Sequence, residues 1–344
     1  MKRPSFPDIM PMFLAVLLVL GCRKEVVKEV RQDDIMRIPA GFPPMHMPDD
    51  NRFTTERWQL GKRLFYEKAL SRNRTVSCAS CHHPQLAFSD STAFSKGDQG
   101  AAGTSNAPTL SNIGYHPYLT RAGSVPTIEM QVLVPVQEHN EFNTHVPDIV
   151  ARLATDTSYQ RMAQQAYGRA MDAFVLTRAL ACFERSIISG NSAYDQYYFQ
   201  GKATAMNDLQ LQGKELFFSE KTNCTACHSG FNFTNYSFEN NGLYTSYADS
   251  GRMRFTRTEA DRARFKVPTL RNIAFTAPYM HDGSIASLDE VVEHYNRGGV
   301  AHPNKNALIR PLQLSNEEKK ALVAFLHALS DYDFIKNKHL KNEE

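Results

Sequence analysis

The sequence predicts a mainly α-helical protein built from two similar halves that are related by an internal repeat. The first observation is a passage that occurs twice. "APTLSNIGYHPYLTRAGS" ends at Ser124, and "VPTLRNIAFTAPYMHDGS" ends at Ser284, with Pro-Thr-Leu, Asn-Ile and Gly-Ser at matching places. The second observation is that apolar residues fall at helical spacing in the remaining segments, and the third is that strand signals are weak. We therefore expect two helical domains, residues 51–200 and 201–335.

The length and composition suit two globular domains and argue against one class of partner. A chain of 344 residues is long enough for each of two domains to bury a core. Hydrophobic residues make up 42% of the chain, and the formal net charge is only +3. Because no cluster of Lys and Arg is present, we expect no nucleic-acid partner.

The first fifty residues are typical of an exported protein. Lys2 and Arg3 precede the apolar run "IMPMFLAVLLVLG", which is too short to span a bilayer and suits an export signal. The run ends in "VLGC", which resembles a bacterial lipoprotein cleavage box and predicts a lipid anchor at Cys22. Leu20 is large for that box, so simple secretion stays open. We expect residues 1–22 to be a signal peptide, residues 23–50 a polar tether, and the periplasm to be the location.

The helices follow one pattern in both halves. "GKRLFYEKALSRNRTVSCASCH" is echoed by "GKELFFSEKTNCTACH", each a helix followed by a loop and a pair of cysteines. Between the halves, "VPDIVARLATDTSYQRMAQQAYG" and "MDAFVLTRALACFERSIISG" have helical periodicity. The last helix starts with a capping box at Ser315 to Glu318 and continues through "KKALVAFLHALS".

Two C-x-x-C-H motifs, Cys78-Ala79-Ser80-Cys81-His82 and Cys224-Thr225-Ala226-Cys227-His228, predict two covalently bound haem c groups. In this motif the two thiols bond to the porphyrin, and the histidine then meets the iron as its proximal ligand. A zinc ribbon would keep its cysteine pairs 15–20 residues apart, and it would not need a histidine after each pair. Cys182 lies in an apolar helical stretch and is expected to be an inert core residue.

The two copies differ where a sixth iron ligand would come from. With Gly123 aligned to Gly283, Pro135 falls opposite Tyr295, each twelve residues past its glycine. A tyrosine can bind haem iron, whereas proline has no side-chain donor. We therefore expect an open first haem and a second haem closed by Tyr295. Met280, His281 and His294 are the alternative ligands for the second iron.

Two polar residues near Pro135 suit an open, reactive haem. Gln131 lies one helical turn before Pro135, and Glu141 follows six residues after it. A carboxylate and an amide beside an open iron could move a proton between the two oxygens of hydrogen peroxide, which is general acid–base catalysis. A lone Gln and a lone Glu are usually surface residues, so this interpretation depends on the repeat.

These residues carry a resemblance to the bacterial dihaem cytochrome c peroxidase and MauG superfamily, over about residues 51–333. The shared passages are "LSRNRTVSCASCHHPQLAFSD", "NAPTLSN", "TACHSGFNF" and "FKVPTLRNIAFTAPYMHDGSIASLDEVVEHYNRGG". The resemblance implies two cytochrome c-like domains, a peroxidatic haem in the first and an electron-transfer haem in the second. It also implies proximal ligands at His82 and His228 and a peroxide-site pair at Gln131 and Glu141.

The resemblance further implies one calcium ion between the two domains. Its protein ligands would be the amide oxygen of Asn106 and the backbone carbonyls of Thr276 and Pro278, which are hard oxygen donors suited to calcium. A homodimer is compatible with the sequence, which does not decide it.

Three departures from the family pattern bear on function. The loop "FSKGDQGAAGTS" lacks the histidine that caps the peroxidatic haem in typical members, so the first haem is expected to be permanently accessible. The usual sixth ligand of the second haem in the family is methionine. This chain instead offers Tyr295, and in this it resembles MauG. Arg121 or a neighbour replaces the tryptophan between the haems, which leaves Tyr115 or Tyr118 as candidates for the electron route.

The sequence supports three hypotheses of function. The first is an exported peroxidase that reduces hydrogen peroxide with electrons from a small c-type cytochrome or copper protein. The second is a MauG-like oxidase that acts on a protein side chain. The third is a dihaem electron-transfer protein without catalysis, against which the open site beside Glu141 argues.

Overall fold

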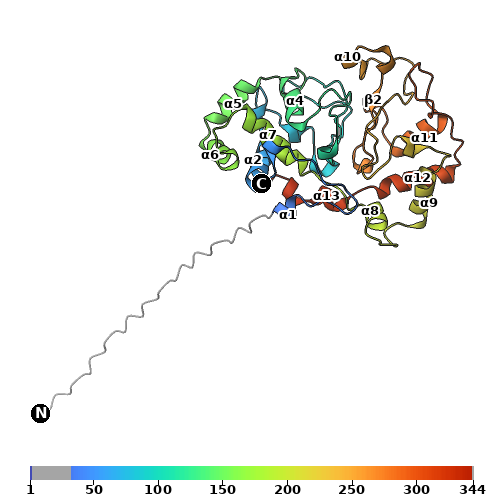
Figure 1. The fold of residues 1–344 in the computed structure, drawn as a ribbon, viewed down its shortest axis with the longest axis horizontal. Helices are drawn as coiled ribbons and strands as arrows, with labels where there is room; N and C mark the ends of the chain where they lie inside the picture. Colours follow the sequence, from blue (N-terminus) through green and yellow to red (C-terminus); the bar gives the residue numbers. More distant parts are fainter. Residues whose placement is uncertain (2–31, 343–344) are drawn as a thin grey trace. The chain divides into compact units, whose positions relative to one another are not determined.

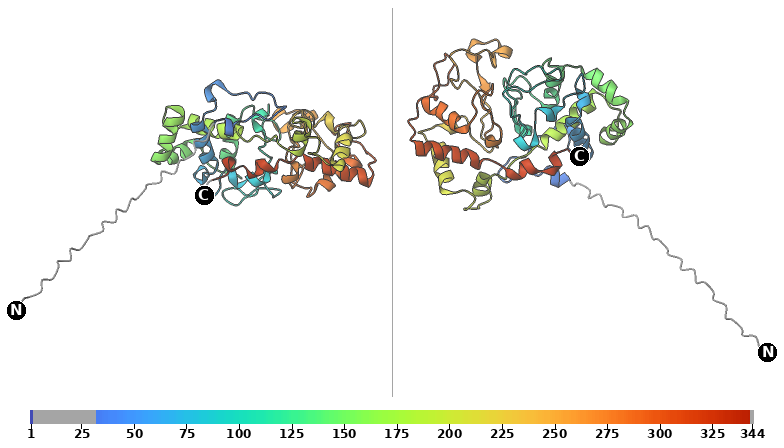
Figure 2. Two further views of the ribbon diagram at one scale, coloured as in Figure 1. Left: turned by 90° about the horizontal axis from the view of Figure 1, so that it is seen from below. Right: turned by 180° about the vertical axis from the view of Figure 1, so that it is seen from behind.

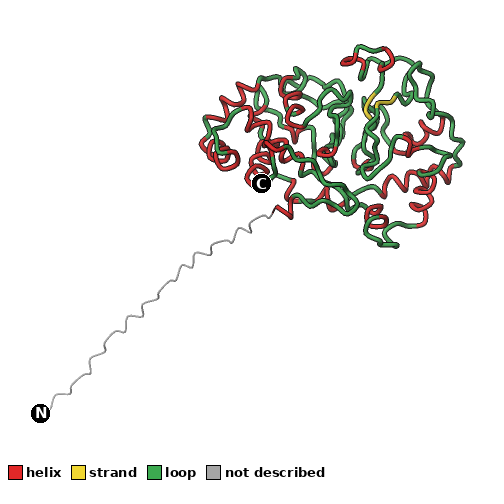
Figure 3. Tube along the Cα trace, in the orientation of Figure 1, coloured by secondary structure: helices red, strands yellow, loops and turns green. Residues whose placement is uncertain are grey.

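Helices and the loops that join them make up nearly all of the chain that the structure describes, which is Met1 and residues 32–342 of a computed structural model (Figure 3). The predicted signal segment and Cys22 lie outside the described residues. The α-helices are α1 (Gln32–Ile35), α2 (Thr55–Phe65), α3 (Ile128–Gln131), α4 (Leu133–Gln137), α5 (Val146–Ala154), α6 (Thr157–Tyr167), α7 (Ala173–Arg185), α8 (Ala193–Tyr198), α9 (Asp208–Phe217), α10 (Met253–Thr256), α11 (Leu288–Arg297), α12 (Asn316–Ala328) and α13 (Tyr332–Lys336).

The strands within the described residues are two short ones, which form one antiparallel pair. In this pair β1 (Phe238–Glu239) lies beside β2 (Phe265–Lys266), with Phe238 opposite Lys266. The mainly α fold predicted from the sequence is therefore confirmed. None of the described helices is long and apolar enough to cross a membrane.

One helix pair organises the first half of the chain. Helix α2 packs along α7, and α5 and α6 lie against the same pair (Figure 1). The two helices approach closely because Gly61 has no side chain. A Cβ at Gly61 would overlap the carbonyl oxygen of Ala179 and crowd Phe183. Leu60, Leu64 and Phe65 of α2 are fully buried.

The second half repeats this packing with α9 and α12. A Cβ at Gly213 would overlap the carbonyl oxygen of Ala321 and crowd Phe325, so Gly213 makes the same contacts as Gly61 does in the first pair. Helix α11 completes this group by packing on α12. As predicted, Ser315 caps α12, and its hydroxyl accepts a hydrogen bond from the backbone N–H of Glu318.

Both ends of the described chain pack on the helices. Part of the predicted tether is buried, because Phe42 is only 9% exposed and its ring lies 4.6 Å from that of Phe231. At the other end, the C-terminal residues return to the first half, where the Tyr66 hydroxyl donates to the Leu340 carbonyl at 2.7 Å. Figure 2 shows the C-terminal segment running from the second group of helices to the first.

Candidate functional site

Each C-x-x-C-H motif forms one tight turn that ends on its histidine. In the first motif the His82 backbone N–H bonds the Cys78 carbonyl at 3.0 Å, and in the second the His228 N–H bonds the Cys224 carbonyl at 2.9 Å. The turns hold the two cysteines and the histidine of each motif together, as covalent attachment of a porphyrin requires. The five described cysteines form no disulfide with one another.

The two histidines are oriented in the same way by backbone carbonyls. His82 Nδ1 lies 2.8 Å from the Phe88 carbonyl oxygen, and His228 Nδ1 lies 3.0 Å from that of Phe233. Burial lowers the pKa of both imidazoles, that of His228 to about 4, so both rings are neutral. A neutral ring that donates Nδ1–H to a carbonyl keeps its lone pair on Nε2, which is the nitrogen that can bind iron.

A cavity of about 930 Å³ reaches both motifs. His82 and His228 line it together with all four motif cysteines, and most of the other lining side chains are apolar. We call the part beside His82 the first site and the part beside His228 the second site. The thiols, the neutral imidazoles and the apolar walls fit a haem in each site.

The first site is closed on one side by a helix that proline interrupts. Thr127 caps α3, and its hydroxyl accepts a hydrogen bond from the Met130 N–H. The helical path then breaks at Val132, between α3 and α4, because Pro135 has no N–H to bond the Gln131 carbonyl. Pro135 lines the cavity and offers no donor atom to it.

Gln131 and Glu141, the residues expected at the peroxide site, both line the cavity. Part of the Glu141 surface stays accessible, yet burial among the cavity walls, with the charge of Glu138 second, raises the pKa of its carboxyl to about 7. The raised pKa brings both the ionised and the protonated form of the Glu141 carboxyl within reach near neutral pH. It can accept or release a proton without a large energetic cost.

The loop without a histidine holds the turn that carries Glu141. The Asp98 N–H donates to the Glu141 carbonyl at 2.8 Å, and a Cβ at Gly97 would overlap the Asn140 carbonyl. Asp98 is itself fixed, since its carboxylate accepts hydrogen bonds from the Ser71 hydroxyl at 2.8 Å and the Asn73 N–H. The loop thus fixes the backbone that carries Glu141 in the first site.

In the second site an uninterrupted helix presents Tyr295 to the cavity. Ser287 caps α11 at the repeat position of Thr127, and the helix continues past Tyr295. Asn241 Nδ2 lies 3.5 Å from the Tyr295 hydroxyl oxygen and 3.3 Å from the Met280 sulfur. Burial raises the pKa of the Tyr295 phenol.

The alternative ligands for the second iron differ in whether they reach the cavity. His294 Nε2 lies 3.1 Å from the Asn241 carbonyl oxygen, and His294 is not among the residues that line the cavity. Met280 and His281 line it beside Tyr295. The arrangement therefore disfavours His294 and keeps Tyr295 and Met280 together around one amide.

Two charged residues of the cavity were not foreseen from the sequence. Glu184 on α7 lines the first site, is 4% exposed, and has its pKa raised to about 8 by burial, with the charge of Glu129 second among the raising effects. Glu184 directly follows Phe183, and the matching residue of the second half, which directly follows Phe325, is Leu326. Lys266 also lines the cavity, and burial, with the charge of Arg121 second, lowers its pKa to about 7. A comparison of the two α-helical repeats could have found Glu184.

The three residues assigned to calcium lie at the cavity wall, but Asn106 does not fit the ion. Its Oδ1 already accepts a hydrogen bond from Arg121 Nη2 at 2.8 Å, and its backbone carbonyl accepts one from Arg121 Nε at 2.9 Å. A guanidinium cation thus occupies the oxygens that Asn106 would offer. Thr276 and Pro278 line the same stretch of wall.

The aromatic residues considered for the electron route lie outside the cavity lining. Tyr115 donates to the Pro43 carbonyl at 3.1 Å, and Tyr118 is 44% exposed, so neither stands between the sites. Trp58 is buried and donates to the Ser186 hydroxyl at 2.9 Å. His116, Arg121 and Lys266 line the cavity instead.

The helical fold and the two matched histidine turns on one cavity define the class of protein, a c-type haem protein with two haem sites. The family model for di-haem cytochrome c peroxidase matches residues 55–204. The MauG protein of Methylorubrum extorquens is 33% identical over 308 residues, covering 88% of this chain and 86% of MauG. The cytochrome-c peroxidase IdrP1 of Denitromonas iodatirespirans is 31% identical over 327 residues, covering 85% of this chain and 86% of the relative.

A solved structure agrees with these sequence relatives. The crystal structure of a MauG-like protein associated with microbial copper homeostasis superposes with a TM-score of 0.85 at 34% identity, covering 89% of this chain and 98% of that chain. The chain therefore belongs to the di-haem cytochrome c peroxidase family, whose members are oxidoreductases.

Proposed function

We propose that this protein is an exported dihaem peroxidase that reduces hydrogen peroxide to water with electrons from a small redox protein. Each half, residues 51–200 and 201–335, would attach one haem. The reaction consumes one H₂O₂, two protons and two electrons, and it forms two H₂O. The relatives named cytochrome c peroxidases support this reaction type.

The difference between Pro135 and Tyr295 carries the proposal. Both residues line the cavity at matching places of the repeat, but only Tyr295 offers an atom that can bind iron. The first site keeps room for a small molecule beside Gln131 and Glu141. The second site has a phenol and a thioether around Asn241, which suits a closed site that transfers electrons.

Bound haem would supply the redox-active iron at each site. The chain's own residues would then manage the protons of the substrate. Glu141 would take a proton from one oxygen of peroxide and return it to the departing oxygen, which a carboxyl with a pKa of about 7 does readily. The Gln131 amide would orient the peroxide by hydrogen bonds, and the pinned loop at Asp98 would keep Glu141 in place.

The partner and location follow from the same proposal. An electron donor such as a small c-type cytochrome or a copper protein would reach the second site. The export signal predicted over residues 1–22 would place the protein in the periplasm, with a lipid anchor where Cys22 is modified.

An electron paramagnetic resonance spectrum of the ferric holoprotein tests the proposal. We expect one high-spin signal from the first haem and one low-spin signal from the second. Mixing with hydrogen peroxide in a stopped-flow spectrophotometer should change the optical spectrum within milliseconds. Two low-spin haems that do not respond to peroxide would rule out the peroxidase.

A second candidate function is oxidation of a protein side chain, and an aromatic series beside the second site favours it. The exposed ring of Tyr198 stacks on Tyr194 with centroids 5.4 Å apart, and Tyr194 lies 5.0 Å from Phe233. The Phe233 carbonyl in turn meets the His228 ring. Closely spaced rings from the surface to His228 suit electron transfer from a docked protein.

Turnover separates the two functions. A peroxidase should oxidise many equivalents of a reduced small cytochrome or copper protein per haem pair in the presence of peroxide. A protein oxidase should oxidise these donors slowly and yet consume peroxide when its own protein substrate is added. Loss of that second activity in Tyr198→Ala, with the peroxide reaction intact, would support the oxidase.

A further inference from the structure

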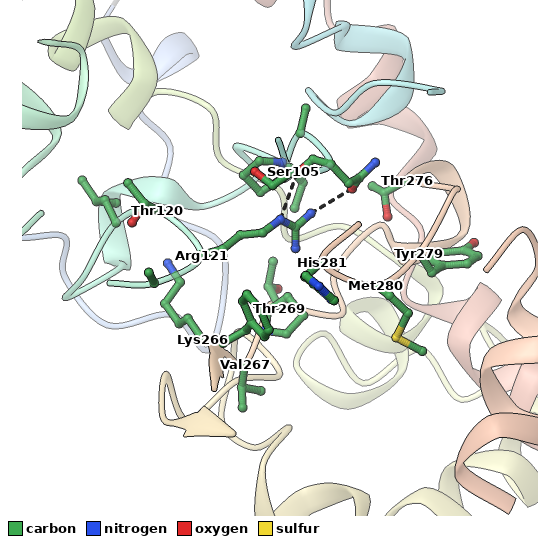
Figure 4. A pocket seen from close by; sticks show the side chains of 18 of the residues that line it. Ser105, Thr120, Arg121, Lys266, Val267, Thr269, Thr276, Tyr279, Met280 and His281 are labelled. Atoms are coloured by element: carbon green, nitrogen blue, oxygen red, sulfur yellow. Dashed lines mark hydrogen bonds between the residues drawn. The ribbon is translucent and has the colours of Figure 1, made fainter. Parts of the chain in front are cut away.

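Asn106 has every polar group bonded inside the protein. It is 4% exposed, its backbone N–H donates to the His281 carbonyl at 3.0 Å, and its Nδ2 donates to the Thr92 carbonyl at 3.0 Å. Its two oxygens both accept from one side chain, at 2.9 Å from Arg121 Nε and 2.8 Å from Arg121 Nη2 (Figure 4). A guanidinium that bridges two oxygens of one residue is a strong, oriented contact.

Arg121 is held at this place by its turn. The Leu119 N–H bonds the Val125 carbonyl at 2.7 Å, and the turn between them presents Arg121 toward Asn106. The matching turn of the second half carries His281, whose carbonyl accepts the Asn106 N–H. Asn106 and the two repeat turns therefore meet at one junction: the Arg121 guanidinium bonds Asn106 within the first half, and the Asn106 N–H bonds His281 of the second half.

The junction already contains a cationic side chain at the place of the expected ion. Arg121 carries a positive charge, because a guanidinium is not deprotonated in proteins. Lys266 ties the same turn to the second half, since its backbone N–H bonds the Arg121 carbonyl at 2.7 Å and its Nζ donates to the Tyr118 carbonyl at 2.7 Å. Figure 4 shows Arg121 and Lys266 pointing into the same pocket.

We propose that Arg121 is a built-in replacement for calcium, so that Asn106, which bonds His281 of the second half, is held in place by a guanidinium and needs no divalent cation. A calcium ion bound to Asn106 Oδ1 would lie beside the guanidinium, and two cations on one oxygen repel each other. The Thr276 and Pro278 carbonyls, which were expected to bind calcium, would then have no ion to bind. This inference does not depend on which substrate the protein oxidises or reduces.

The first experiment uses the full-length dihaem protein. After treatment with a calcium chelator, we expect the electron paramagnetic resonance and optical spectra of both haems to be unchanged. Titration with calcium chloride in a calorimeter should give no saturable heat up to the millimolar range, where weak calcium sites still bind. Saturable calcium binding, or spectra that the chelator alters and calcium restores, would overturn the proposal.

The second experiment removes the guanidinium. We expect Arg121→Gln to lose a few degrees of melting temperature, to alter the haem spectra, and to recover part of both losses when calcium is added, because the Asn106 oxygens are then free. Arg252→Gln is the matched control. Its guanidinium donates to the neighbouring Ala122 carbonyl at 3.3 Å but does not touch Asn106, so no calcium response should appear.

Two results with Arg121→Gln would overturn the proposal that Arg121 replaces calcium. An Arg121→Gln protein that matches the wild type in melting temperature and spectra would show that the guanidinium does not hold the junction. A damaged variant that calcium does not rescue would show that Asn106 is no cation site, which also overturns the replacement. Where Arg121→Gln fails to fold, Arg121→Lys keeps the charge but bonds only one oxygen, and it should show the same calcium rescue to a smaller degree.

Discussion

The two halves share a scaffold and differ in what they present to the cavity. Gly61 and Gly213 bring their helix pairs together through the same contacts, and Thr127 and Ser287 cap the following helices at matching positions. After those caps the halves diverge. The first breaks its helix at a proline, whereas the second continues a whole helix past Tyr295.

The two halves also differ in the polarity of one buried position that faces the cavity. Glu184 in the first half takes the place that Leu326 has in the second, so the first site gains a buried carboxyl where the second is apolar. The comparison teaches that helix packing is set by a few close contacts, while the chemistry is set by single residues on the inner faces. The predictions below test this division.

Placing a donor at Pro135 should have the largest effect. Pro135→Tyr gives the first half the residue of the second, and we expect the high-spin signal and the peroxide reaction to disappear together. Gln137→Tyr, on the exposed part of the same helix, is the control and should keep both. A Pro135→Tyr protein that still reacts with peroxide would show that this position does not face the iron.

Glu141→Gln should slow the reaction with peroxide by about 10²–10⁴-fold, the usual contribution of a positioned proton carrier. In the wild type the rate constant should rise as pH rises through about 7, because Glu141 accepts a proton only when ionised and its pKa is about 7. The variant should lose this dependence in stopped-flow measurements across pH.

A neighbouring carboxylate offers the control for that pH profile. Glu138→Gln removes the charge that helps to raise the pKa of Glu141, so the midpoint of the profile should move to lower pH while the fast rate remains. If Glu138→Gln is as slow as Glu141→Gln, the assignment of proton transfer to Glu141 alone is wrong.

Tyr295→Phe should convert the second haem from low spin to high spin, because phenylalanine has no donor atom. Loss of an anionic donor should also raise the reduction potential of that haem in a spectroelectrochemical titration. Met280→Leu is the paired variant, and it should leave the low-spin signal in place. If the signal instead survives in Tyr295→Phe and vanishes in Met280→Leu, the sulfur is the ligand.

The shared scaffold should give the smallest and most even effect. Gly61→Ala and Gly213→Ala each force a methyl group against a backbone carbonyl, which should lower the free energy of unfolding by about 1–3 kcal/mol. Urea unfolding of the two variants should give similar losses. A large loss in one variant and none in the other would mean that the two helix pairs do not carry equal roles.

The sequence predicted those parts of the site that depend on local pattern or on the repeat. The attachment motifs need only neighbouring residues, and helix caps such as Ser315 are read within four positions. Pro135 and Tyr295 were found because the two copies could be aligned. Each of these predictions uses information within one segment or between two similar ones.

What the sequence did not predict involves partners that only packing brings together. Arg121 and Asn106 are fifteen positions apart, and their contact depends on a turn and a loop that meet the second half. The neutral state of Glu184 comes from burial on a helix face that also looks like ordinary core. Asn241, which joins Tyr295 to Met280, comes from a loop with no periodic signal.

The return of the C-terminal residues to the first half affects the order of assembly. Phe334 lies 5.9 Å from Phe88, whose carbonyl orients His82, and Leu340 accepts the hydroxyl of Tyr66. These contacts come from residues that lie more than 240 positions after the first attachment motif in the sequence. The earlier attachment motif therefore acquires these contacts only after Phe334 and Leu340 have been synthesised, and a chain that stops before Phe334 would lose them.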